Sequence, residues 1–77
     1  MKNILEEIIK KVVMSPEDVK VQEMEGSGNY IVYEIEVKKE DRGRLIGKNG
    51  KTYNLIFDLM KIIASKNSKK IHLTIIE

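Results

Sequence analysis

The stretch DRGRLIGKNGKT, residues 41–52, combines residue types and spacings that could bind an anion. Gly47 and Gly50 are separated by Lys48 and Asn49, and further basic side chains stand on both sides. Glycine adopts backbone conformations that a Cβ forbids and lets another chain come close, while the free amides at a helix start attract anions. The pattern therefore predicts a phosphate-binding loop, whose basic residues are Arg42, Arg44, Lys48 and Lys51.

Two other structures could contain the same glycines. A plain corner between two helices needs a glycine to turn, which explains Gly47 but not the basic residues around it. A nucleotide-binding P-loop, G-x-x-x-x-G-K-[ST], shares its last three positions with residues 50–52. That pattern requires glycine where this chain has Leu45, and it follows a strand, whereas a helix is expected here. The anion-binding loop is the favoured interpretation, and the plain corner is the remaining alternative.

Charge is unevenly distributed along the 77 residues. Residues 1–37 carry four Lys/Arg and eight Asp/Glu, a net charge of −4, whereas residues 38–77 carry ten and four, a net charge of +6. This asymmetry indicates one basic face, as expected of a protein with a nucleic-acid partner. An ordinary solvated surface rich in Lys and Glu would explain the charge equally well.

The chain offers few groups for catalysis, metal binding or membrane insertion. His72 is the only histidine, there is no cysteine, and the three acidic pairs are expected on a helix face, in a turn and at a helix cap: Glu6/Glu7, Glu17/Asp18 and Glu40/Asp41. Charged residues interrupt the apolar N-terminal stretch, and no later stretch could cross a bilayer. We therefore expect no enzyme, no metal, no cofactor and no membrane contact, and a cytoplasmic location.

Hydrophobic periodicity predicts six elements in the order α-β-β-α-α-β. They are a helix at 3–14, strands at 19–25 and 30–38, a short helix from an Asp41 N-cap to Ile46, a helix at 51–66, and a strand at 71–76. A right-handed crossover through two helices sets the second and third strands parallel and adjacent. The expected fold is α+β, with a three-stranded mixed sheet and three helices on one face.

The loop and this order of elements resemble the KH domain. GRLIGKNGKT between two helices is similar to its G-x-x-G signature, and the α-β-β-α-α-β order resembles the type II form. Length, the EDRGRLIGKNGKT stretch and the last strand resemble the small bacterial single-KH-domain proteins of the KhpA family, over essentially all of residues 1–77. One position departs from the family: Tyr53 stands where those proteins usually have a small or aliphatic residue. A larger side chain there would change the width of the RNA-binding groove beside the loop.

The resemblance implies that the loop clamps the backbone of single-stranded RNA, over about four nucleotides. One of Leu45 and Ile46 would pack inward and the other would form a wall for the bases, and the last strand with the loop before it would form the opposite wall, near Lys66, Lys69, Lys70 and His72. The expected RNA-binding residues are Arg42, Arg44, Ile46, Gly47, Lys48, Asn49, Gly50, Lys51 and Thr52.

The resemblance also implies protein partners. These are a second copy of the chain and a larger KH-domain protein, with which it would act as a global RNA regulator or RNA chaperone in bacteria. The alternative is a dimerisation module in which the loop no longer binds nucleic acid.

The helix at 51–66 gives an independent reason to expect a homodimer. Its apolar arc spans about 220°, roughly twice what packing on a sheet requires. The first helix could cover part of the excess, and this is the alternative explanation. Tyr53 and Phe57 lie one turn apart beside the loop, where no other segment is expected to cover them, so we predict that both residues belong to the dimer interface.

Overall fold

The main elements of the computed structural model, which describes residues 1–77, follow one another in the predicted order. They are α1 (Lys2–Val12), β1 (Lys20–Glu25), β2 (Tyr30–Glu36), α2 (Arg42–Ile46), α3 (Lys51–Lys66) and β3 (Lys70–Ile75). Single turns of 3₁₀ helix at Pro16–Asp18, Lys39–Asp41 and Lys48–Gly50 join some of them. The predicted α+β class and the order of the type II KH fold are both confirmed.

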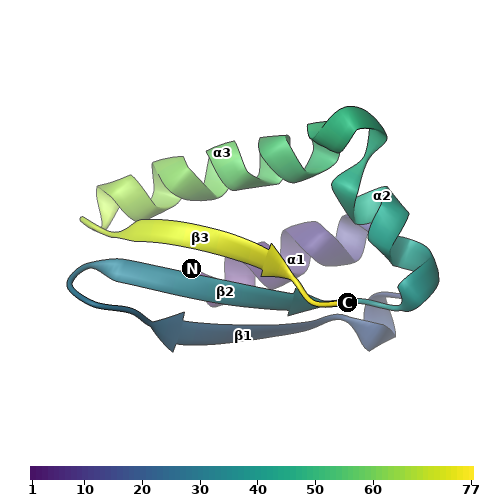
Figure 1. The fold of residues 1–77 in the computed structure, drawn as a ribbon, viewed down its shortest axis with the longest axis horizontal. Coiled ribbons are helices and arrows are strands. Elements are labelled where there is room, and N and C mark those ends of the chain that lie inside the picture. Colours follow the sequence, from purple (N-terminus) through teal and green to yellow (C-terminus); the bar gives the residue numbers. More distant parts are fainter.

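The three strands form one sheet with β2 in the centre (Figure 1). β1 pairs with β2 in antiparallel register, with Lys20 opposite Glu36, and β3 pairs with β2 in parallel register, with Tyr30 opposite Lys70. The mixed sheet expected from the right-handed crossover is therefore present. Helices α1, α2 and α3 pack on one side of this sheet, and its other face is open to solvent.

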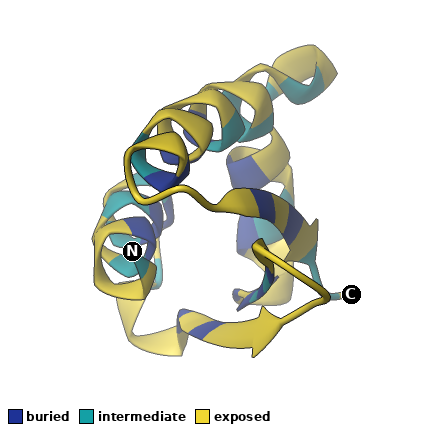
Figure 2. Cartoon of the chain, turned by 90° about the vertical axis from the view of Figure 1, so that its left-hand side faces the viewer, coloured by how far each residue is buried: buried dark blue, intermediate teal, exposed yellow.

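The core lies between the helices and the sheet, where the buried stretches of the ribbon face one another (Figure 2). Side chains alternate between the two faces of a strand, so every second residue of β2 and β3 points to the helices. The helices contribute residues at three- and four-residue spacing. The main core residues are Leu5 and Ile9 of α1; Ile31, Tyr33 and Ile35 of β2; Ile56, Met60 and Ala64 of α3; and Ile71 and Leu73 of β3.

Tyr33 is the largest fully buried side chain, and its hydroxyl has no hydrogen-bond partner within the chain. Burial, and after it the neighbouring Glu23 carboxylate, disfavour the charged phenolate and raise the pKa of Tyr33 from 10.0 to about 12. The native state therefore keeps its proton up to a higher pH than the unfolded chain does. Between about pH 10 and 12 the folded state binds more protons, and the free energy of unfolding falls as pH rises.

Tyr33→Phe is expected to remove this pH dependence. The wild type should lose about 2 to 3 kcal/mol more stability than the variant between pH 10 and 12, measured by urea denaturation at each pH. At pH 7 the variant should be as stable as the wild type or more stable, because it no longer buries an unpaired hydroxyl. Parallel pH profiles for the two proteins would contradict this assignment.

Candidate nucleic-acid interface

The loop between α2 and α3 is short and ordered. The Gly47 amide donates to the Gly43 carbonyl at 2.8 Å and ends α2, and the Gly50 amide donates to the Gly47 carbonyl at 3.2 Å. Three of its residues have positive φ: Gly47 (77°), Asn49 (56°) and Gly50 (75°). The chain therefore leaves one helix and enters the next within a single turn, as the G-x-x-G spacing predicts.

The two glycines are required for different reasons. A Cβ on Gly47 would meet Thr52 Oγ1 and lie 2.7 Å from the Thr52 backbone nitrogen. A Cβ on Gly50 would find only the Asn54 side chain nearby, at 3.8 Å. The close contact within the chain is therefore at Gly47, where the start of α3 packs against the end of α2, and Gly50 supplies a left-handed conformation.

The tip of the loop presents polar and basic groups to solvent. Lys48, Asn49 and Lys51 are exposed, and no side chain caps the start of α3, so helix amides there are available to an anion. The two residues before the loop divide as predicted, with Leu45 buried (1% exposed) and Ile46 at the surface (41%). Ile46 thus provides an apolar surface directly beside the basic tip.

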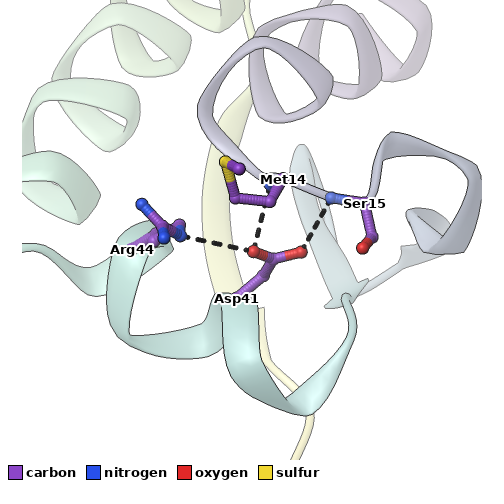
Figure 3. A network of polar contacts seen from close by, with 4 residues as sticks. All are labelled: Met14, Ser15, Asp41 and Arg44. Carbon is purple, nitrogen blue, oxygen red and sulfur yellow. Dashed lines mark hydrogen bonds and ion pairs between the residues drawn. The ribbon is translucent and has the colours of Figure 1, made fainter.

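Asp41 holds α2 in place by contacts with the end of α1 (Figure 3). Its carboxylate oxygens accept hydrogen bonds from the backbone amides of Met14 and Ser15, both at 3.0 Å, and only 2% of Asp41 is exposed. Asp41 occupies the predicted N-cap position of α2, but its side chain makes no cap hydrogen bond there. The carboxylate instead satisfies two amides that follow α1, and it ties the loop-bearing helix to the rest of the fold.

The two arginines of α2 lie on different sides of the helix. Arg42 precedes Ile46 by four residues and shares its side, and the Arg42 Nε is buried without a partner in the chain. Arg44 lies about 200° around the helix from Ile46, and its Nε is 3.6 Å from Asp41 Oδ1. The structure therefore places Arg42 beside the expected RNA-binding residues and engages Arg44 with Asp41.

Tyr53, in the first turn of α3, contacts β3 beside the loop. The Tyr53 hydroxyl donates to the Leu73 carbonyl at 2.6 Å, and burial raises the pKa of Tyr53. Its ring stacks on Phe57 with centroids 6.0 Å apart, and Lys61 Nζ lies 5.3 Å from the centre of the Phe57 ring. Tyr53 is therefore covered in part by β3, contrary to the expectation that no segment reaches it.

A basic pocket of about 510 Å³ lies between the C-terminal end of α3 and the start of β3. The pocket contains three lysines and no acidic residue; its lining is Asn29, Tyr30, Lys61, Ala64, Ser65, Ser68, Lys69, Lys70 and Ile71. Lys69 and Lys70 were expected on this wall. Lys61 was not expected there, although its position one turn after Phe57 indicates that the two side chains lie on the same side of α3.

Two residues expected on the same wall lie elsewhere. Lys66 lines a neighbouring hollow with Asp58 and Ile62. His72 pairs with Val32 on the open face of the sheet, because Ile71 and Leu73 on either side of it face the helices.

A family model named "KhpA/KhpB, KH domain" matches residues 2–75. The chain belongs to this family. RNA-binding protein KhpA of Chlamydia caviae is 43% identical over 77 residues, which are 100% of this chain and 97% of that protein. RNA-binding protein KhpA of Listeria monocytogenes is 42% identical over 77 residues, 100% of each chain. Membership confirms the predicted family and the expectation that the chain is not an enzyme.

Solved structures of Era share the fold at low sequence identity. One, Aquifex aeolicus Era bound to GDP and AlF4−, superposes with a TM-score of 0.66 at 20% identity. Another, Era in complex with MgGDPNP and nucleotides 1506–1542 of 16S ribosomal RNA, gives a TM-score of 0.59 at 20% identity. The match covers 96% of this chain and 28% of each Era chain, so it concerns one part of those proteins.

The structure contains no helix long and apolar enough to cross a membrane. It also contains no group of three or more His, Cys, Asp or Glu side chains that could hold a metal ion.

Replacing the glycines of α2 and the loop by alanine should separate their roles. Gly47→Ala should cost about 2 to 4 kcal/mol, because the new methyl group meets Thr52 and the backbone has positive φ. Gly50→Ala should cost about 1 to 2 kcal/mol from the left-handed conformation alone. Gly43→Ala is the control. Gly43 is helical and has open space around it, so alanine there should stabilise the protein by about 0.5 to 1 kcal/mol. Urea denaturation gives all three values, and equal losses at Gly47 and Gly50 would contradict the assignment of the close approach.

Proposed function

We propose that this protein binds single-stranded RNA by gripping its backbone with residues 47–50. The observation that carries the proposal is the approach of Thr52 to Gly47, which brings an uncapped helix start and the exposed Lys48 and Asn49 together at one tip. Backbone amides and a lysine at one tip are suited to a phosphodiester. Relatives that match the whole chain are named RNA-binding proteins.

A single strand fits this surface better than a duplex. The binding tip is one turn of chain with a single exposed apolar residue, Ile46, beside it. Unstacked bases can lie against such a narrow surface, whereas proteins that recognise duplex RNA contact two successive grooves over a larger area. The proposed contacts are Arg42, Arg44, Ile46, Gly47, Lys48, Asn49, Gly50, Lys51 and Thr52, with Arg44 also paired to Asp41.

The RNA path extends from the loop along α3 to the basic pocket around Lys61, Lys69 and Lys70. Residues 51 to 65 of α3 cover about 21 Å, so the pocket lies some nucleotides away from the loop. The lysines there would contact phosphates of the same strand. This arrangement explains why the basic residues concentrate in the second half of the chain.

Replacing Lys48 and Asn49 with aspartates should abolish RNA binding and leave the fold intact. Two negative charges at the tip repel a phosphodiester, whereas substitutions at exposed loop positions usually change stability little. The matched control is Lys2→Asp with Asn3→Asp, the same pair of residues at an exposed position in α1. Fluorescence anisotropy with a labelled RNA octamer measures the affinity. Wild-type affinity in a folded loop variant would refute the proposed site.

The salt dependence of binding should be shallow. Each phosphate contact on a single strand contributes about −0.7 to the slope of log K against log salt, so two to four contacts at the loop, measured with a short RNA that does not reach the pocket, give about −1.5 to −3. Anisotropy titrations at several salt concentrations give this slope. A value near zero would exclude a phosphate grip.

The cellular role that we propose follows from the family. The protein would act in the bacterial cytoplasm as a global RNA regulator or RNA chaperone, together with a larger KH-domain protein. Recovery of RNA and of that protein with the tagged chain after cross-linking in cells tests this role.

A second candidate function, self-association, is favoured by the surface of α3. Leu55, Leu59 and Ile62 form a stripe at four- and three-residue spacing with exposed fractions of 71%, 44% and 59%. Tyr53 and Phe57, the predicted interface residues, are half-buried and lie about 160° around the helix from Leu55. We propose a homodimer; the exposure of α3 favours the Leu55 stripe as its centre, and a role for Tyr53 and Phe57 stays a prediction.

Sedimentation equilibrium at micromolar concentrations should give the mass of a dimer. Leu55→Glu should shift the mass to that of a monomer, because it places a charge within the apolar contact. Asn54→Glu adds the same charge at the next exposed residue and should leave the dimer intact. A monomer mass for the wild type would exclude self-association, and a dimer that binds no RNA would favour the pure dimerisation module.

A further inference from the structure

We propose that Tyr53 makes RNA binding by this protein insensitive to base identity, because its side chain occupies the free edge of β3 beside the loop. The proposal rests on the proposed function and concerns the surface beside the same loop. It assigns to Tyr53 the role of a residue that determines specificity, through its contact with the Leu73 carbonyl at 2.6 Å.

The edge of β3 next to α3 is a possible site for reading bases. β3 is the last strand of the sheet, so only one side of its backbone has a strand partner. The Lys70 amide donates to the Asn29 carbonyl, just before β2, and the Ile76 amide donates to the Ile35 carbonyl of β2. Because successive residues of a strand direct their amides and carbonyls to opposite sides, those of Ile71, Leu73 and Ile75 point away from β2.

Such backbone groups could discriminate between bases. A base that leaves the stack presents hydrogen-bond donors and acceptors on its edges, and proteins recognise single-stranded RNA through these edges. The Leu73 amide and carbonyl form a donor and acceptor pair of the required kind, and the carbonyl is in contact with Tyr53 from the first turn of α3.

Tyr53 fills this position within the folded chain. Its hydroxyl already donates to the Leu73 carbonyl, and its ring is held by stacking on Phe57 at an interplanar angle of 17°. A tyrosine hydroxyl is protonated at neutral pH and donates, and burial raises the Tyr53 pKa further. A base would have to displace a partly buried hydrogen bond and an aromatic pair to reach Leu73. The remaining contacts, from the loop and Ile46, are with the backbone and the faces of bases, which all four bases share.

Oligocytidine and oligouridine octamers give a sharp test. The two pyrimidines have the same ring size, and their pairing edges differ by exchange of donor and acceptor. The wild type should bind them with affinities within about twofold of each other. Tyr53→Ala opens the edge of β3, and its affinities for the two should differ by about fivefold, the effect of one hydrogen bond. Met24→Ala, which removes an exposed apolar side chain from β1 on the open face of the sheet, is the control and should behave as the wild type.

A second measurement uses the wild type alone. The carbonyl ¹³C resonance of Leu73 should not move when saturating RNA shifts the amide resonances of residues 47–50. Movement of the Leu73 resonance as large as that of the loop, a wild type that already distinguishes the two octamers fivefold, or a folded Tyr53→Ala variant that does not distinguish them would each overturn the proposal. No binding of either octamer by the wild type would instead refute the proposed function.

Discussion

The packing of Thr52 directly against Gly47 forces the geometry of the binding tip. With any side chain at position 47, the first turn of α3 could not lie against the end of α2. The positive φ of Gly47, Asn49 and Gly50 then closes the loop within three residues. This one steric condition exposes Lys48 and Asn49, leaves the start of α3 uncapped, and sets Ile46 beside them.

A tight loop is useful only if the helices on both sides of it are fixed. The buried Asp41 carboxylate fixes α2 by accepting from the Met14 and Ser15 amides. Removing that carboxylate would leave two amides without their partner, and hydrogen bonds to charged groups contribute about 1.5 to 3 kcal/mol each. Ile56, Met60 and Ala64 fix α3 on the sheet. The loop therefore binds as a preformed tip, and little ordering is required when RNA arrives.

Periodicity predicted the elements, and steric rules predicted how they are arranged. The alternation of Ile31, Tyr33 and Ile35 identified β2, and the right-handed crossover gave its parallel pairing with β3. Long-range polar contacts could not be predicted this way. Asp41 accepts hydrogen bonds from two amides that lie 26 and 27 positions earlier in the chain, and Tyr53 donates one to a carbonyl 20 positions later. Neither pairing produces a periodic pattern in the sequence. The position of His72 on the open face could have been predicted, since its neighbours Ile71 and Leu73 are both apolar.

The most direct test of the RNA grip is a ¹H–¹⁵N NMR titration of the wild-type protein with a single-stranded RNA octamer. Our account predicts that the largest shift changes occur at residues 46–52, with smaller changes around Lys61 and Lys70 and none at Val32, Glu34 or Thr74 on the open face of the sheet. Shift changes centred on that open face, with the loop amides unmoved, would contradict it.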